Sequence, residues 1–340
     1  MNASERTVKV AVIGVGHLGH HHARIYTELP GVELAAVVDV AETRRREEGG
    51  RLRVPALSDY RELLGKVDAV SVAVPTVLHH QITREFLLAG SDVLVEKPIT
   101  RTLCEADDLV GIAVATGRIL QVGHSERYNG GVQALAQHIH DPDFIEVHRM
   151  GPFPGRGTDV DVVLDLMIHD IDIVLGLMKS EVKHVDAVGQ VVKSPYEDIA
   201  TAILQFENGT IANVSASRLS ETKIRAMAIS QEKAFIYLNF ETQDINIYRG
   251  YSPSFFVSSK EITYKQESFV ERVLVQKENA LKEEIQHFAH CILGKSEPIV
   301  SGEDDIKTLA IALKIIEKIN EKHKEPDGRL NIKAPSGTVG

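Results

Sequence analysis

The first third of the chain alternates short apolar runs with helix-like segments, and this alternation restricts the possible folds more than any other feature. Runs rich in Val, Ile and Ala predict strands that are buried on both faces. Strands that alternate with helices form right-handed βαβ crossovers. The sequence therefore predicts an α/β fold with a doubly wound parallel sheet in residues 1–124. The apolar runs are residues 8–16, 34–40, 69–75, 93–98 and 119–124, and the helix-like segments are residues 17–29, 42–49, 79–90 and 104–117.

The pattern changes after residue 124. A loop rich in Gly and Pro leads to an apolar segment at residues 162–178, which we expect to be a helix. Residues 201–218 contain two strand-like runs around Asn208 and Gly209, a pair typical of a type I′ turn. Residues 227–250 continue in the same manner. These patterns predict a mostly antiparallel second sheet.

Two amphipathic helices are expected near the C-terminus, at residues 279–293 and 303–321. A chain of 340 residues is long enough for two domains of ordinary size. We therefore assign residues 1–124 to a cofactor domain and residues 125–326 to a domain for substrate binding and oligomerisation. Residues 327–340 form a polar tail.

Gly14, Gly16 and Gly19 form a G-x-G-x-x-G pattern between the first predicted strand and the first predicted helix. The first glycine permits a tight turn, the second lets the backbone approach a pyrophosphate, and the third allows close helix packing. The helix N-terminus supplies free N–H groups for the phosphates. This context predicts a dinucleotide site of the Rossmann type, with His17 and Leu18 inside the turn.

Asp39 ends the second predicted strand, where the fingerprint expects an acid for the ribose hydroxyls. Arg44, Arg45 and Arg46 follow, and they could meet the 2′-phosphate of NADP. A solvated helix face is the commoner meaning of such a run. Because the carboxylate would repel an additional phosphate, the sequence favours NAD over NADP.

The charge balance limits the partners. The formal net charge of −10 argues against a nucleic-acid or anionic-membrane surface. No apolar stretch is long enough to span a bilayer, and the N-terminus lacks the pattern of a signal peptide. Cys104 and Cys291 are too far apart in sequence to suggest a disulfide framework. A cytoplasmic protein without membrane or nucleic-acid partners is expected.

Asp165, His169 and Asp172 stand at i, i+4 and i+7 of the apolar segment, so a regular helix would place them on one face. Buried polar groups that converge are candidates for proton transfer, for metal binding or for a satisfied core network. The three consecutive histidines at residues 20–22 do not converge, because successive helical residues point in different directions. Surface or packing roles suit them better than a metal site.

Lys97 ends a predicted strand and is followed by Pro98. Ligands bind at the carboxyl edge of open α/β sheets, so Lys97 is expected beside the cofactor. A lysine near a reacting hydroxyl stabilises the developing alkoxide, whereas its ordinary role is a surface salt bridge.

The chain resembles the Gfo/Idh/MocA oxidoreductase family in an ordered set of motifs. They are GVGHLG, Asp39, AVPTVLHH, EKP, DLMIHDID and, near the C-terminus, GEDDIKTLAIALKII. The resemblance covers most of the chain. It implies a Rossmann domain that carries a nicotinamide cofactor, and an α/β domain with an open sheet that supplies the substrate site. It also implies a homodimer or homotetramer.

The resemblance implies that Lys97, Asp165 and His169 are catalytic and also contact substrate. It places Pro75, Thr76 and His79 near the ribose and nicotinamide, with Glu96, Lys97 and Gln121 close by. Met167 stands where the histidine signature of the family has glycine.

Within the family, GHSERYN and HRMGPFPGR resemble a subgroup that oxidises the 3-hydroxyl of UDP-N-acetylglucosamine. Substrate contacts are then expected from Arg127, Tyr128, Asn129 and Arg156. Arg127, Arg149 and Arg156 also suit a diphosphate, because guanidinium groups make bidentate hydrogen bonds to phosphate oxygens.

The sequence therefore predicts an NAD-dependent dehydrogenase of a sugar or nucleotide sugar. His169 would remove the hydroxyl proton and Lys97 would stabilise the alkoxide, since the pKa of histidine lies near neutrality. Asp165 would orient His169 or bind another hydroxyl, and Asp172 is interpreted as structural. Oxidation of another sugar, an inositol or a sugar phosphate is the main alternative. A non-catalytic NAD-binding regulator and metal-dependent chemistry are weaker ones.

Overall fold

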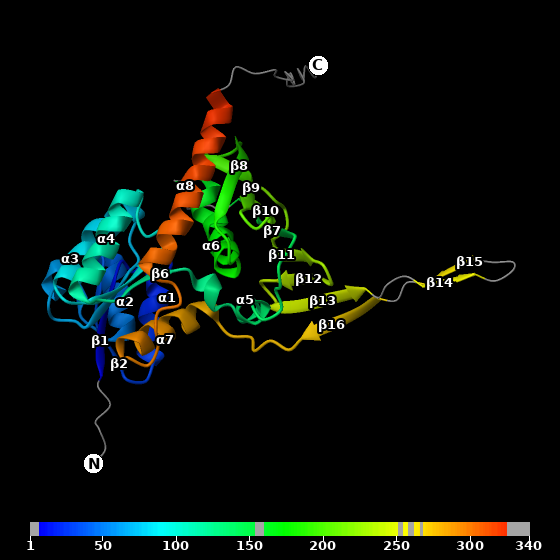
Figure 1. Ribbon diagram of the computed structural model, residues 1–340. Helices are drawn as coiled ribbons and strands as arrows, with labels where there is room; N and C mark the ends of the chain where they lie inside the picture. Colours follow the sequence, from blue (N-terminus) through cyan, green and yellow to red (C-terminus); the bar gives the residue numbers. More distant parts are fainter. Residues whose placement is uncertain (1–6, 154–159, 251–253, 258–261, 266–267, 325–340) are drawn as a thin grey trace, which may run out of the picture.

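The computed structural model describes residues 7–153, 160–250, 254–257, 262–265 and 268–324. It contains two large sheets, and the long C-terminal helix packs on both of them (Figure 1). Arg156, one of the expected diphosphate ligands, and the tail at residues 327–340 lie outside the described residues.

The first sheet is parallel throughout and has six strands in the order β3-β2-β1-β4-β5-β6. This is the doubly wound arrangement, and it confirms the α/β prediction for the first third of the chain. Only the two-residue strand β3 was missed, because two residues carry no periodic signal. The strands are β1 (Val8–Ile13), β2 (Val32–Val38), β3 (Ala56–Leu57), β4 (Ala69–Val72), β5 (Asp92–Glu96) and β6 (Leu120–Gly123).

Helices cover both faces of this sheet. On one face α1 packs together with α7, which returns from the C-terminal part of the chain and adds Ile285 and Phe288 to the core. On the other face α3 and α4 pack with the first half of α8. The helices are α1 (Gly19–Glu28), α2 (Glu42–Leu52), α3 (His79–Leu88), α4 (Leu103–Thr116), α7 (Ala280–Ile292) and α8 (Gly302–Lys324), with 3₁₀ turns η1 (Tyr60–Leu63), η2 (Thr76–Leu78) and η3 (Ser125–Tyr128).

The second sheet has eight strands in the order β16-β13-β12-β11-β7-β10-β9-β8. All neighbours are antiparallel except β7 and β10, as predicted for a mostly antiparallel sheet. The strands are β7 (Phe144–Met150), β8 (Val182–Val191), β9 (Glu197–Phe206), β10 (Ile211–Ser217), β11 (Ile224–Gln231), β12 (Ala234–Asn239), β13 (Asp244–Gly250) and β16 (Ser268–Val273), and β14 (Ser254–Val257) pairs with β15 (Ile262–Lys265) in a separate ribbon.

One face of the second sheet is buried under α5 (Gly130–Leu135), α6 (Ile168–Leu177) and the second half of α8. The long helix α8 therefore runs from the first sheet to the second, as Figure 1 shows. It spans the two cores with Leu309 in one and Ile315 and Ile319 in the other. This places the carboxyl edge of the first sheet opposite the covered face of the second.

Two local predictions were wrong. The turn between β9 and β10 is not of type I′, because only Gly209 takes a positive φ, at 96°. The Gly209 N–H donates to Phe206 O, which makes a three-residue loop with glycine in the left-handed position. The side chain of Asn208 instead accepts a hydrogen bond from the Thr210 N–H, at 3.2 Å.

The apolar segment is also not a regular α-helix from its start. Residues Val163–Met167 (η4) form a π-helical turn, in which the Ile168 N–H donates to Val163 O, and α6 begins only at Ile168. A π-turn changes the angular spacing of side chains, so the i, i+4, i+7 rule does not hold across it. Asp165 consequently lies in a different environment from Asp172.

Candidate active site

The three glycines of the fingerprint occupy the turn between β1 and α1. Gly14 has a φ of +86°, and a Cβ there would lie 2.5 Å from the Ala73 carbonyl oxygen. A Cβ on Gly19 would collide with the carbonyl of Gly14. At Gly16 a Cβ would meet only Arg44 Nη1, at 3.9 Å, so the space over this residue is open. These contacts fit a backbone turn that leaves room for a pyrophosphate.

Asp39 is buried at the end of β2, next to this turn. Its carboxylate accepts hydrogen bonds from Val15 N, at 3.1 Å, and from Ala41 N, at 2.9 Å. Arg44 Nη1 lies 3.2 Å from Asp39 Oδ2. The carboxylate is thus held in place where the ribose hydroxyls of NAD would lie, and Arg44 is paired with it.

Two hollows meet at this edge of the sheet. The smaller, of about 600 Å³, lies over Gly16 and Asp39. The larger, of about 1090 Å³, lies between the two sheets. His17 and Pro75 line both of them. The adenosine end and the nicotinamide end of NAD would occupy these hollows in that order.

The loops after β4 and β5 are connected by a buried histidine. His79 Nε2 lies 2.8 Å from Val74 O, and His79 Nδ1 lies 2.9 Å from Pro98 O. Burial lowers the pKa of this imidazole. Pro75, Thr76 and His79, which the family resemblance places near the ribose and nicotinamide, line the large cleft. His79 therefore orders the wall of the cleft.

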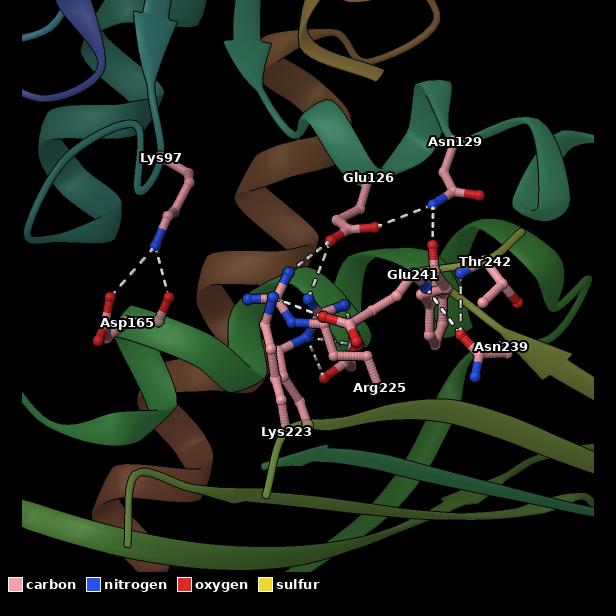
Figure 2. A network of polar contacts seen from close by, with 12 residues as sticks. Lys97, Glu126, Asn129, Asp165, Lys223, Arg225, Asn239, Glu241 and Thr242 are labelled. Atoms are coloured by element: carbon pink, nitrogen blue, oxygen red, sulfur yellow. Dashed lines mark hydrogen bonds and ion pairs between the residues drawn. The ribbon is translucent and has the colours of Figure 1, made fainter. Parts of the chain in front are cut away.

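Lys97 extends from the end of β5 into the cleft and meets Asp165, as Figure 2 shows. Its Nζ donates to the backbone oxygen of Asp165, at 2.5 Å, and lies 3.7 Å from Asp165 Oδ1. Burial lowers the pKa of Lys97, and the carboxylates of Asp165 and Glu96 oppose that effect. The π-turn and the strand end thus bring two of the three predicted catalytic residues together.

His169 is partly buried on α6, and its Nδ1 has no hydrogen-bond partner among the described residues. Burial lowers its pKa well below the ordinary value, and the nearby charges of Lys97, Arg149 and His124 lower it further. Both effects favour the neutral form of the imidazole. A neutral imidazole is able to accept a proton.

Asp172 lies in a separate buried network. Its Oδ2 is 3.1 Å from Arg127 Nε and 3.9 Å from His124 Nδ1. His124 Nε2 is 2.5 Å from Asp305 Oδ1, so β6, α6 and α8 meet here. The network involves Arg127, one of the expected substrate ligands, in an ion pair with Asp172.

Glu96 and Gln121 lie on the face of the first sheet that α1 and α7 cover. Glu96 Oε1 is 3.0 Å from His22 Nε2, and this contact, together with the charge of Lys97, lowers the pKa of Glu96 despite its burial. Gln121 is fully buried, and neither end of its amide has a partner among the described residues. Glu96 also lines the large cleft, whereas Gln121 does not.

Arg149 is tied up in the protein interior. Its guanidinium binds Asp170 through three contacts of 2.7 to 3.0 Å, and its Nη1 lies 3.0 Å from Glu126 Oε1. It is only 3% exposed. Although Arg149 lines the cleft, its donors are therefore largely used by carboxylates rather than left for a diphosphate.

Tyr128 and Asn129 are also buried, and neither lines the large cleft. Asn129 caps α5 by accepting from Gly131 N and donates to Phe240 O, at 2.9 Å. These contacts give Asn129 a structural role at the junction with the second sheet.

Sequence reasoning missed several charged residues of this region. Side chains along β11 alternate between the two faces of the sheet, so Arg225 shares a face with Met227. The register with β7 places Arg225 beside Arg149. This alternation was the available signal. Asp305 lies in the GEDDIK motif, but nothing in that motif indicates that it contacts residue 124. The missed residues are Arg101, Lys223 and Arg225 in the wall of the cleft, and Glu126, His124 and Asp305 behind it.

Two further features bear on the alternatives. Among the described residues no group of three or more His, Cys, Asp or Glu side chains is arranged to hold a metal ion. No helix in the described part of the chain is long and apolar enough to cross a membrane.

Comparisons with known proteins agree with this geometry. Residues 8–124 match a family described as "Oxidoreductase family, NAD-binding Rossmann fold", and residues 131–237 match the GFO/IDH/MocA C-terminal domain. The chain is 34% identical over 312 residues to a UDP-N-acetylglucosamine 3-dehydrogenase of Acidithiobacillus ferrooxidans, covering 91% of this chain and 96% of that protein. It is 28% identical to a scyllo-inositol 2-dehydrogenase (NAD(+)) of Bacillus subtilis, with 91% and 93% covered.

A solved structure of UDP-N-acetylglucosamine 3-dehydrogenase from A. ferrooxidans superposes with a TM-score of 0.84. The identity is 33%, and the match covers 93% of this chain and 98% of that one. Both sheets are therefore shared with a known dehydrogenase. The chain belongs to the Gfo/Idh/MocA family of NAD-dependent oxidoreductases, and it is a dehydrogenase that acts on CH–OH groups.

Proposed function

We propose that this enzyme oxidises the 3-hydroxyl of UDP-N-acetylglucosamine with NAD, producing the 3-keto sugar nucleotide. The relatives include both nucleotide-sugar and inositol dehydrogenases, so the substrate has to be inferred from the cleft itself. The observation that carries the proposal is the charge of the cleft wall, which favours an anionic substrate over a neutral polyol.

Among the described residues, the wall of the large cleft contains six Lys or Arg side chains and two carboxylates. The chain as a whole carries a formal net charge of −10. The two carboxylates that pair with Arg149, Asp170 and Glu126, are not part of the wall, whereas Asp165, which faces Lys97, is. A cleft that focuses positive charge in this way attracts anions. The cations are Lys97, Arg101, Arg149, Arg218, Lys223 and Arg225, and the carboxylates are Glu96 and Asp165.

Lys223 and Arg225 are the best candidates for the diphosphate of such a substrate. Arg225 is only loosely paired, with Nη1 3.7 Å from Glu126 Oε1. Lys223 is half-exposed and pairs with Glu241, on the loop after β12. Figure 2 shows both side chains beside these carboxylates. A diphosphate would take over these cations, because phosphate oxygens make stronger charge-assisted hydrogen bonds.

At the other end of the site the reaction needs a base and a cation. His169, which is neutral, takes the proton of the 3-hydroxyl, and Lys97 donates a hydrogen bond to the developing alkoxide. Asp165 holds the Lys97 ammonium by its backbone oxygen and faces it with its carboxylate. NAD, when bound over the glycine turn, would supply the acceptor for the hydride of the sugar carbon. The carbon is thus oxidised to a ketone, and one proton remains on His169.

A screen of candidate substrates tests the proposal. Purified enzyme is mixed with NAD and either UDP-N-acetylglucosamine, free N-acetylglucosamine, scyllo-inositol or myo-inositol, and the formation of NADH is followed by absorbance. We expect turnover with the nucleotide sugar. Turnover with an inositol and none with the nucleotide sugar would overturn the substrate assignment.

A pair of variants tests the diphosphate contacts directly. Arg225→Gln should raise the KM for UDP-N-acetylglucosamine about tenfold or more, because a charge-assisted hydrogen bond is lost. Arg272→Gln, on exposed β16, is the matched control and should leave the KM unchanged. Equal KM values for the two variants would contradict the assignment.

We also propose that the protein is a homo-oligomer assembled through the uncovered face of the second sheet. One cross-strand row on this face is apolar over five of its six strands. Its apolar members are each 36–50% exposed, an area that a second copy would cover. The row consists of Val270, Tyr248, Phe235, Ser230, Phe144 and Ile211.

A cytoplasmic location completes the proposal. Its support is the absence of a disulfide between Cys104 and Cys291, both of which are free thiols. Cell fractionation with an antibody against the protein tests it, and recovery in an extracellular fraction would contradict it.

A further inference from the structure

A second histidine lies directly against His169. The rings of His124 and His169 pack edge to face, with their centroids 6.0 Å apart and an angle of 87° between the planes. His124 follows the end of β6 and is fully buried, whereas His169 is on α6. The two residues are thus brought together only by the packing of the two sheets.

His124 also lies close to two buried carboxylates. Its Nε2 is 2.5 Å from Asp305 Oδ1, on α8, and its Nδ1 is 3.9 Å from Asp172 Oδ2, on α6. Asp305 Oδ2 also accepts the backbone N–H of Ile99, at 3.4 Å, two residues after Lys97. Asp305 therefore contacts both His124 and the segment at Lys97–Ile99.

We propose that His124, held as an imidazolium by Asp305 and Asp172, is a positioning residue for His169. It fixes the orientation of the His169 ring and, as a neighbouring cation, keeps that ring in the neutral form that accepts a proton. The inference rests on the proposed function, in which His169 is the base.

Three further cations around His169 come from three different strands or strand ends. Lys97 follows β5, Arg149 lies on β7, and Arg225 lies on β11, and each of these cations lowers the pKa of His169 together with His124. Lys97 is balanced by Asp165, and Arg149 and Arg225 by Asp170 and Glu126. Among the described residues that lower the pKa of His169, His124 is the one whose side chain packs against the His169 ring.

The test is to measure the titration of His169 directly, by NMR of nitrogen-15-labelled histidine in the protein without substrate. The His169 signal is identified by its loss in His169→Ala. In His124→Gln the removal of the adjacent cation should raise the pKa of His169 by about one unit. In Asp305→Asn, His124 should lose its positive charge, but the negative charge of residue 305 is lost as well. The rise in the pKa of His169 should therefore be smaller.

The matched control is Glu303→Gln, which removes an exposed carboxylate from the same turn of α8. It should leave the pKa of His169 unchanged. The acid limb of kcat against pH should move to higher pH in the order Asp305→Asn, then His124→Gln. If His124→Gln does not fold, Asp305→Asn keeps the shape of the side chain and carries the test alone.

The outcomes separate this inference from the proposed function. Normal turnover by His169→Ala overturns the assignment of the base, and with it the inference. If His169→Ala is inactive but the pKa of His169 is unchanged, or lowered, in both Asp305→Asn and His124→Gln, only the inference is overturned. A general loss of activity without a shift of the pH profile also counts against it, because a purely structural role would produce that result.

Discussion

The two ends of the active site are built in different ways. At the cofactor end, the turn from β1 to α1 and Asp39 lie within about 25 residues of one another, close to the spacing of the fingerprint. At the proposed catalytic end, Lys97 follows β5, His169 is on α6 and Asp305 is on α8. The cofactor end is thus a property of a short piece of chain, whereas the catalytic end exists only when two sheets and a long helix have packed.

This difference predicts two kinds of failure. Changes at the cofactor end should alter NAD affinity through backbone geometry. Changes at the catalytic end should alter turnover, or the stability of the interface that assembles it, while NAD binding remains. The following substitutions test that division, from the largest expected effect to the smallest.

His169→Ala should lower kcat by about a thousandfold, which is the range for loss of a general base. The NAD affinity should change little, because His169 is on α6, away from the glycine turn. Steady-state kinetics and fluorescence titration with NADH measure the two effects. His184→Ala, an exposed histidine of β8, is the control. A large loss of NADH binding by His169→Ala would show that the two ends are not separable.

Asp170→Asn should destabilise the fold by about 3–5 kcal/mol, because it leaves the buried guanidinium of Arg149 without its main partner. Asp186→Asn is the control, since Asp186 pairs with Lys322 on the surface, where such a pair contributes little. Urea denaturation measures both. Equal midpoints for the two variants would mean that the buried pair does not stabilise the catalytic half.

Gly14→Ala and Gly31→Ala separate backbone strain from the cofactor site. Both glycines have a positive φ, of 86° and 75°, so alanine should cost each about 1–2 kcal/mol of stability. Only at Gly14 would the new Cβ also crowd Ala73 and Val74. We expect Gly14→Ala to lose NAD affinity at least tenfold and Gly31→Ala to keep it. Parallel loss in both would indicate strain alone.

Phe235→Asp should have the smallest effect on turnover. It places a charge in the apolar row of the second sheet, so the oligomer should dissociate while kcat changes less than about twofold. Light scattering after size-exclusion chromatography measures the mass, with Lys183→Asp, an exposed residue of β8, as the control. An unchanged mass would place the interface elsewhere.

The parts predicted correctly are those in which local chain chemistry decides the structure. Near-continuous apolar runs have to be buried on both faces, so the sequence predicted the longer strands of the first sheet. The glycine spacing identified the turn between β1 and α1. The prediction for residues 162–178 was wrong in its first turn, where residues 163–167 form a π-turn and the Asp165 carbonyl accepts a hydrogen bond from Lys97. No periodicity encodes that contact.

The diphosphate ligands show the same limit. Arg149 looked available in the sequence, yet its guanidinium is occupied by Asp170 and Glu126, while Arg225, which carried no motif, lines the cleft. Whether an arginine is free depends on which carboxylates fold next to it. Those carboxylates are 21 and 23 residues away from Arg149.

By itself the sequence determined the order of strands and helices and the class of cofactor, because local sterics and burial act over a few residues. It also identified Lys97, Asp165 and His169 as candidate catalytic residues through their motifs. Only the tertiary structure decided that Asp165 faces Lys97 while Asp172 lies near His124. It also decided that α8 brings Asp305 into contact with His124 and with Ile99, two residues after Lys97. Contacts between such distant residues arise from the packing of whole elements, which no single stretch of sequence encodes.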